Sequence, residues 1–564
     1  MSTVALKSGS KAESRNGIAM YLVVIVVAIL SLGAIALFSI ITTERQATTI
    51  RGDEIQVRAA AESGIEFVRS ICNLTEAEQT QLGGIVNNPK LFAGVEVLTT
   101  VRRSRPTSFR FTVLAPNING GKLNGVRYGL TNESARLHLE TVLQWEQESP
   151  GRGRQALMSL PGMHPGIADS ILDWIDPDAT QRSSGAEIEY YRRIGVPYGP
   201  RNAIPVSLEE LLLVRDVSRS LLFGDDANFS FGFSPHSATR SEVAVPQGSS
   251  STGSTIIAPE IPSVDSPLDS GLDGMTPPEF LPEQIDEGFS MTDTVIPPLD
   301  MVNPPPSVDS PLASAMSSFG QTASQGNMPW AYYLTTLSAE KEVNPQGIAK
   351  FDLNEANLEY LYTQIKQAVD EQAADFVVLA RKDGKTLETP LDLLTPLATT
   401  AADGTPETVA SPFDAKVSGG SDRLSKLLDY GTTSRAVVIT GRININEAPL
   451  EVLRAIPEMT ENTASQIIAR RQAIAASSRR TALRHPTWLL TEELVDLPQM
   501  KSLWNRITTG GSVYRCQVVG FLDDQGTASR FEVVVDATVK PPRQVFFKDL
   551  TMYGRGFSAT ILRP

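Results

Sequence analysis

The chain has 564 residues, 41% of them hydrophobic, and a formal net charge of −14. This length is enough for two to four domains, and the acidic balance argues against a nucleic-acid partner, because a negative surface repels the phosphate backbone. Only two cysteines are present, Cys72 and Cys516, which excludes a disulfide scaffold and a CxxC metal site. Four histidines without an HExxH motif argue against a histidine zinc site.

The most informative segment is an uncharged apolar run over residues 18–41. At about 1.5 Å per residue it would span roughly 36 Å as a helix, enough to cross a bilayer. Lys7, Lys11 and Arg15 precede it. By the positive-inside rule they keep the N-terminus in the cytoplasm and leave the rest of the chain outside.

Three kinds of segment begin in this way. A cleaved secretory signal has a shorter apolar core and a small-residue cleavage site after it, whereas polar residues 42–45 follow here. A plain signal anchor remains an alternative. The third possibility rests on Gly17, which lies directly before Ile18. This arrangement resembles a prepilin leader, whose peptidase would cut after Gly17 and leave Ile18 as the new N-terminus.

Helical spacing of apolar residues continues past the membrane segment. The positions on the predicted face are Ile50, Ile55, Val57, Ala60, Ala61, Ile65 and Val68. A long helix that is first apolar and then amphipathic resembles the stem of a pilin. Most pilins carry a glutamate at the fifth mature position, where this chain has Leu22. The departure is typical of protein K of the type II secretion system.

Alternating apolar residues predict strands at both ends of the body. Residues 95–101 and 109–114 form one predicted hairpin and residues 513–521 and 531–539 a second, with a third strand within 545–553. A sheet built from such distant segments implies that the middle of the chain is inserted into it.

The middle contains an internal repeat. Residues 351–361 and 443–453 match at six of eleven positions, and residues 136–143 are a weaker copy. Leu160–Met163 and Ile456–Met459 each predict a turn between two helices, which resembles a helix-hairpin-helix module. Glu458 replaces the hairpin glycine in the second copy, so DNA binding is the alternative and compact packing is favoured. A basic stretch at 470–484 keeps that alternative open.

Residues 171–202 carry the most specific resemblance to the protein K family, through Asp176-Pro177-Asp178, Gly185-Ala186-Glu187, Tyr190-Tyr191 and Asn202. The resemblance implies a calcium site near this loop, with Asp176, Asp178, Glu187 and, more weakly, Asn202 as ligands. Carboxylate oxygens suit calcium. The alternative is that these residues cap helices and pair with nearby arginines.

We therefore predict an α+β fold, with the stem helix packed on an antiparallel pilin-like sheet and large helical insertions. The predicted divisions are a leader at 1–17, a transmembrane helix at 18–41, stem and first strands at 42–130, a first helical domain at 131–233, a disordered Pro/Ser-rich linker at 234–330, a second helical region at 331–510 and final strands at 511–564.

The resemblance implies a minor pseudopilin at the tip of a type II secretion pseudopilus. It would be held in the bacterial inner membrane with its body in the periplasm. Its partners would be other minor pseudopilins, prepilin peptidase, the inner-membrane secretion platform and the lipid bilayer. No catalytic motif is present, so no enzymatic activity is expected. The alternatives are a membrane-anchored DNA-uptake protein and a minor pilin of a type IV pilus. Whether Cys72 and Cys516 are bridged stays open.

Overall fold

The computed structural model describes residues 14–102, 105–119, 122–224, 226, 229–231, 328–400, 406–476, 479–523 and 526–564. Most of the predicted leader lies outside the described residues, and so do the side chains of Gly17 and Ile18. The predicted linker lies outside them up to residue 327.

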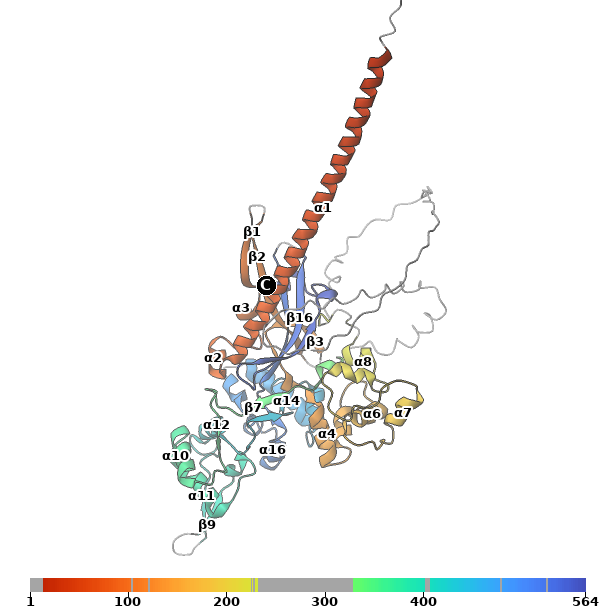
Figure 1. The fold of residues 1–564 in the computed structure, drawn as a ribbon. Coiled ribbons are helices and arrows are strands. Elements are labelled where there is room, and N and C mark those ends of the chain that lie inside the picture. The colour runs from red at the N-terminus through yellow and green to blue at the C-terminus, as the bar shows by residue number, and fades with distance from the viewer. Residues whose placement is uncertain are drawn as a thin grey trace, which may run out of the picture. The chain divides into compact units, whose positions relative to one another are not determined.

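One helix, α1, runs from Ser14 to Asn73 (Figure 1). It includes an exposed apolar segment that is long and apolar enough to cross a membrane. Its second half packs on the sheet through Val57, Ala60, Ala61, Ile65 and Val68, all buried as predicted. Ile50 and Ile55 are 52% and 66% exposed, so their place on the packing face was predicted wrongly. Ile55 lies two residues before Val57, which at 3.6 residues per turn puts it on the opposite side of the helix.

The sheet joins strands from both ends of the body, in the order β1-β2-β15-β16-β17. The first two strands are β1, Val95–Arg102, and β2, Arg105–Asn119. The last three are β15, Val513–Leu522, β16, Ala528–Asp536, and β17, Arg543–Asp549. All neighbours pair antiparallel, with β3 (Lys122–Tyr128) on β2 and β4 (Thr131–Asn132) on β15. The predicted α+β fold, with its middle inserted between paired strands, is confirmed.

Two glycines let the stem approach the sheet closely. A Cβ atom at Gly520 in β15 would lie 2.1 Å from the Val57 carbonyl oxygen of α1. A Cβ atom at Gly64 in α1 would lie 2.5 Å from Cγ1 of Val518. Both distances are well below van der Waals contact, so the seam between helix and sheet requires residues without side chains at these points.

The insertion contains three similar units, each closed by a two-residue parallel strand pair. The pairs are β5 with β6 (Leu137–His138 with Leu334–Thr335), β8 with β11 (Phe351–Asp352 with Gly431–Thr432) and β13 with β14 (Ile443–Asn444 with Ile507–Thr508). The weak copy at 136–143 is thus the start of a full structural repeat.

Local hydrogen bonds explain why the same backbone recurs. In each opening strand the second residue accepts a hydrogen bond from the backbone N–H two residues later, as Asn444 does from Asn446 at 2.9 Å. Asp352 and His138 do the same in the other two units. Each closing strand ends in a threonine whose hydroxyl accepts from an N–H two residues on: Thr335, Thr432 and Thr508. Such side-chain turns stop the strands after two residues.

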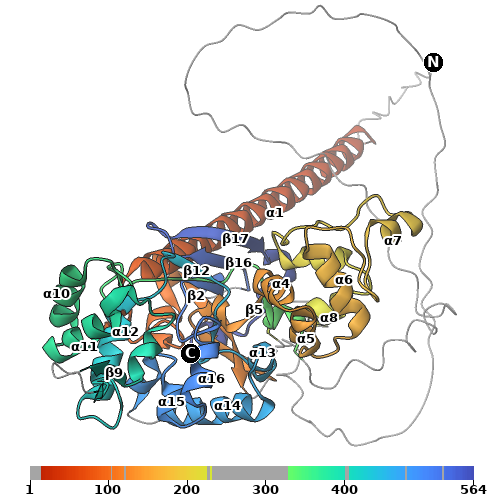
Figure 2. The ribbon, with the colours of Figure 1, turned by 90° about the horizontal axis from the view of Figure 1, so that it is seen from below.

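The helices that the structure describes in the insertion form three clusters (Figures 1 and 2). The first unit holds α4 (Leu139–Glu148), α5 (Arg152–Met158), α6 (Pro165–Ile175), α7 (Ile188–Arg193), the 3-10 helix η2 (Leu208–Leu213) and α8 (Arg219–Phe223). The second holds α10 (Leu358–Ala368), α11 (Glu371–Arg381) and α12 (Gly420–Tyr430). The third holds α13 (Leu450–Ala455), α14 (Glu461–Ala476), α15 (Trp488–Thr491) and α16 (Leu497–Leu503).

Hydrophobic cores group these units differently from the predicted domains. The first and third units share one core, whereas the second unit has its own. The region predicted as a single segment at 331–510 is therefore divided between two cores. Met328 and Trp330 are buried in the shared core, so the predicted linker cannot extend to residue 330.

Candidate functional site

The two predicted helical hairpins have the same backbone conformation at their turns. Gly162 has a φ of +71° between α5 and α6, and Glu458 has a φ of +69° between α13 and α14. In each turn the N–H of the following methionine donates to the carbonyl three residues earlier, from Met163 at 3.2 Å and from Met459 at 3.1 Å. The glycine and the glutamate are thus structurally equivalent.

These hairpins are packing elements within the shared core. The Ser159 hydroxyl, at the end of α5, donates to the Glu451 carbonyl of α13 at 3.0 Å. Trp330 Nε1 donates to the Pro161 carbonyl in the first turn at 2.8 Å. The Glu458 carboxylate lies 3.7 Å from Arg152 and 3.9 Å from Arg506. A carboxylate at a turn would repel a phosphate, so this geometry does not favour DNA binding.

The arginines of the basic stretch after the second hairpin are bound to other groups of the protein. Arg470 and Arg479 both lie against the Glu492 carboxylate, at 3.4 and 2.6 Å. Arg484 donates to Asp429 at 2.8 Å, and Arg471 donates to the Ile445 carbonyl at 2.7 Å. Burial lowers the pKa of Arg471 to about 10. Arginines held in this way are poorly placed to neutralise phosphates.

The acidic loop after α6 gathers buried carboxylates around one guanidinium. Arg182 donates through one nitrogen to Asp173 at 2.8 Å and to Asp176. Both aspartates are nearly inaccessible, at 0% and 3% exposure. Burial raises the pKa of each carboxyl, and the bonds from Arg182 offset part of that rise. The predicted pairing with an arginine is therefore present in this loop.

Two carboxylate oxygens in the loop stay without a hydrogen bond. They are Asp176 Oδ1 and Glu187 Oε1, both buried. Burial, together with the charges of Asp173, Asp176 and Asp178, raises the pKa of Glu187 to about 7. A pKa near 7 means that about half of the Glu187 carboxyls carry a proton at neutral pH.

The other two predicted ligands, Asp178 and Asn202, form hydrogen bonds within the loop. Asp178 Oδ1 accepts from the Thr180 N–H at 2.7 Å, which lowers the Asp178 pKa. Asn202 donates its amide to the Asp178 carbonyl at 2.8 Å. Among the residues that the structure describes, no group of three or more His, Cys, Asp or Glu side chains is arranged to hold a metal. The open oxygens of Asp176 and Glu187 suit a hard cation, and carbonyl or water oxygens would have to complete its shell.

Sequence reasoning did not include Asp173 among the candidate ligands, although it lies at the centre of the cluster. The signal was its spacing: Asp169, Asp173 and Asp176 fall on one side of the helix at steps of four and three residues. Three carboxylates buried on one side of a helix require a positively charged or hydrogen-bonding partner in the protein interior. Gly185 makes room for this group, since a Cβ atom there would lie 1.9 Å from Asp173 Oδ2.

Residues 135–222 match the family model described as type II secretion system (T2SS), protein K. This segment is therefore similar to protein K of the type II secretion system, and we call it the protein K unit. No curated protein and no solved structure matched the chain in the other two comparisons. The matched segment contains α4 to α7, η2, all of α8 except Phe223, the first hairpin and the acidic loop. The protein K unit is thus the first of the three repeated units.

The protein K unit is joined to the sheet by a buried ionic network. Glu133, with 0% exposure, accepts from Arg515 of β15 at 2.7 Å and lies 3.2 Å from Arg136. Burial acts to raise the pKa of Glu133, but the two arginines outweigh it and lower the pKa to about 2. Cys72 and Cys516, on the stem and on β15, are both buried free thiols.

Proposed function

We propose that this chain is a minor pseudopilin that forms the tip of a type II secretion pseudopilus and supports export across the outer membrane. The observation that carries the proposal is the position of the protein K unit. It follows a 60-residue helix and is inserted between paired strands of a sheet on which that helix packs. This role is structural, because the subunit would act by assembling into a filament rather than by catalysing a reaction.

Leu22 supports an end position in the filament. In pilins with a glutamate at this position, the carboxylate offsets the N-terminal amine of a neighbouring subunit in apolar surroundings. Leu22 lies on the apolar part of α1 with its side chain 60% exposed, and it cannot provide that charge. A subunit that lacks the carboxylate is suited to the end of the stack.

Secretion in the host tests this function. A strain without the chain should accumulate type II cargo in the periplasm, and the wild-type gene should restore release into the medium. Leu22→Glu should still enter the membrane but should impair secretion or allow subunits to add above it. Unchanged secretion in the deletion strain, together with reduced DNA uptake, would favour a DNA-uptake role instead.

We also propose that calcium binds the acidic loop of the protein K unit through Asp176 and Glu187, with Asp178 and Asn202 nearby. The bound ion would offset the repulsion among Asp173, Asp176 and Glu187, which Arg182 alone neutralises only in part. It would stabilise the loop that connects α6 to α7.

A further inference from the structure

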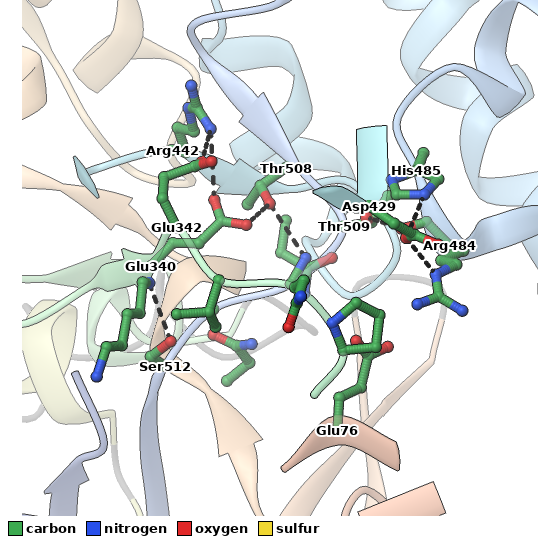
Figure 3. Close-up of a pocket in the computed structure, with 18 of the residues that line it drawn as sticks. Glu76, Glu340, Glu342, Asp429, Arg442, Arg484, His485, Thr508, Thr509 and Ser512 are labelled. Carbon is green, nitrogen blue, oxygen red and sulfur yellow. Dashed lines mark hydrogen bonds and ion pairs between the residues drawn. The ribbon is translucent and has the colours of Figure 1, made fainter. Parts of the chain in front are cut away.

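A cavity of about 450 Å³ lies between the end of α1, the segment around β7 (Ala339–Lys341) and the second and third units (Figure 3). The charged groups in its wall bind one another. Glu342 lies 3.1 Å from Arg442, and Asp429 lies 2.8 Å from Arg484. These ion pairs hold the wall together, so the charges around this cavity have a structural role.

The face of the sheet that points away from α1 offers a different kind of surface. Val518 of β15 contacts the stem, and side chains alternate along a strand, so Val519 and Phe521 point to the opposite face. They form a buried apolar cluster there with Leu114 of β2. Residues 554–564 cover this cluster, and we call them the C-terminal strap.

Two side chains anchor the strap. Phe557 and Leu562 are 4% and 0% exposed, and they belong to the same cluster as the strand residues beneath them. Leu562 ends the short helix α17 (Ala559–Leu562), and residues 558–560 between the two anchors are exposed. A few buried side chains with exposed neighbours are typical of a peptide bound on a surface.

The sheet also binds the backbone of the strap. The Thr112 hydroxyl donates to the Leu562 carbonyl at 2.6 Å, and the Tyr128 hydroxyl donates to the Ile561 carbonyl at 2.8 Å. The Gly94 N–H donates to Thr112 Oγ1 at 2.8 Å, which leaves the hydroxyl proton free to point at the strap. Donors directed at two successive carbonyls hold a peptide backbone whatever its side chains are.

A carboxylate receives the end of the strap. Arg563 lies 3.3 Å from Asp523 Oδ2, next to the Leu562 anchor. Asp523 also accepts from Arg110 Nε at 3.2 Å. The surface therefore combines two apolar contacts, two donors for carbonyl oxygens and a carboxylate for a basic side chain, which together define a pattern in a peptide.

The strap is joined to the body in a way that allows it to leave while the sheet stays intact. In the part of the chain that the structure describes, it pairs with no strand. The N–H groups of Ile561 and Leu562 donate to Ser558 within the strap itself. Gly554 and Gly556, at its start, have φ of +71° and +73°, where glycine is free of strain and provides a hinge.

Closure of the strap has an electrostatic cost. A Cβ atom at Gly556 would overlap the Arg530 guanidinium, so the strap passes directly over this group. Arg530 is 0% exposed, and its Cζ lies 5.7 Å from the centroid of the Phe557 ring. Burial lowers the pKa of Arg530 to about 10, although the charges of Asp226 and Glu532 act against this effect. Opening of the strap would return the guanidinium to water.

We propose that this face of the sheet is a peptide-binding site, which the C-terminal strap occupies until it opens at Gly554 and Gly556 and gives way to a segment of another protein. The segment that fits has an aromatic residue, a leucine five residues later and an arginine directly after it, as in Phe557, Leu562 and Arg563. The tethered strap keeps the site closed by its high effective concentration. The proposal does not depend on the filament role, because it concerns the face opposite the stem.

Peptide binding to the full chain in detergent tests the site, with a fluorescent peptide of residues 554–564 as the probe. In Phe557→Ala combined with Leu562→Ala, the strap loses both anchors while the surface beneath keeps its residues. We expect saturable binding to this double variant and binding about tenfold weaker to the wild type, whose own strap competes. A peptide with alanine at both anchor positions should bind neither chain. Equal affinity for the two chains, or no saturable binding to the variant, would overturn the proposal.

Two further measurements separate a binding site from damage to the fold. The double variant should still unfold cooperatively on heating, and loss of its transition would overturn the proposal by showing that the strap is integral to the core. Asp523→Asn, added to the double variant, should weaken peptide binding severalfold, because the arginine of the peptide loses its partner. Glu62→Gln, on the exposed side of α1, is the matched control and should leave the affinity unchanged. Equal affinities in these two variants would contradict the proposed pattern.

Discussion

Gly162 and Glu458 occupy the same position in two helical hairpins and share a left-handed backbone, with φ of +71° and +69°. Glycine adopts this conformation without strain, whereas a side chain in it costs about 1 kcal/mol. The two hairpins therefore reach one geometry at different conformational cost. The weak ion pairs of Glu458 with Arg152 and Arg506 do not remove that cost, since both exceed 3.5 Å.

Substitution at these two turns should have opposite effects. Glu458→Gly should raise the free energy of unfolding by about 0.5–1 kcal/mol, because the strain is relieved. Gly162→Ala should lower it by at least as much, since the new Cβ would also lie 3.2 Å from Leu221. Urea unfolding measures both. A loss of stability in Glu458→Gly would mean that its carboxylate contributes more than its backbone costs.

The seam between stem and sheet should not tolerate a side chain at Gly520. In Gly520→Ala the methyl group would press on the Val57 carbonyl, and such overpacking typically costs about 1–3 kcal/mol. Gly526→Ala is the matched control, because nothing lies within 4 Å of its added Cβ. Comparable stability of the two variants in urea would contradict the close approach of α1 to β15.

The ionic network at Glu133 should make the protein sensitive to acid. The pKa of this carboxyl is about 2 in the folded state against 4.5 ordinarily. The contribution of this carboxylate to the free energy of unfolding is therefore complete above pH 4.5 and is lost as the pH falls toward 2. Glu133→Gln should cost about 3–5 kcal/mol at pH 7, because it removes the carboxylate that faces the buried Arg136 while Arg515 keeps Glu532, and much less near pH 2. Glu62→Gln, on the exposed side of α1, should leave the profile unchanged.

Calcium should raise the Tm of the full chain relative to a chelator. The gain follows mass action, about 2.7 kcal/mol at a hundredfold excess over the Kd. Asp176→Ala combined with Asp178→Ala should abolish the difference, and Glu187→Gln should reduce it. Glu189→Gln, an exposed acid on α7, is the control. Equal Tm values for the wild type in calcium and chelator would leave the pairing with Arg182 as the better account of the cluster.

Processing of the N-terminus should follow the pilin pattern. Coexpression with a prepilin peptidase should yield a chain that begins at Ile18, as read by N-terminal sequencing. Gly17→Leu should block the cut, whereas Gly33→Leu within the apolar segment should not. An intact leader, or cleavage after residue 41, would contradict the pilin interpretation.

The strands were accessible from the sequence through the alternation in 513–521 and 531–539, but β15 and β16 are largely buried on both faces, so the alternation did not show which side chains are buried. The pairing of β2 with β15 was not predicted, since the sequence analysis only placed both hairpins in one sheet. The closing strands were missed. Leu334–Thr335, Gly431–Thr432 and Ile507–Thr508 are too short for any periodicity, although each is followed by a second threonine.

The candidate site was predictable only in part. Asp176 and Glu187 were chosen through the resemblance to the protein K family, and both have open buried oxygens. Asp178 and Asn202 fit the same pattern but bond locally, which depends on backbone geometry that composition does not report. Glu133 and Arg515 were not linked in advance, since 382 residues separate them.

Each parallel strand pair also fixes the two ends of its unit side by side. Leu137 pairs with Leu334 although almost two hundred positions of sequence lie between them. We call such a strand pair a clamp. Residues added between its two strands cost little entropy, because the entropic cost of closing a loop grows only slowly with its length. The clamp thereby makes the interior of the protein K unit a permissive place for evolutionary expansion, while the register of the pilin-like sheet stays the same.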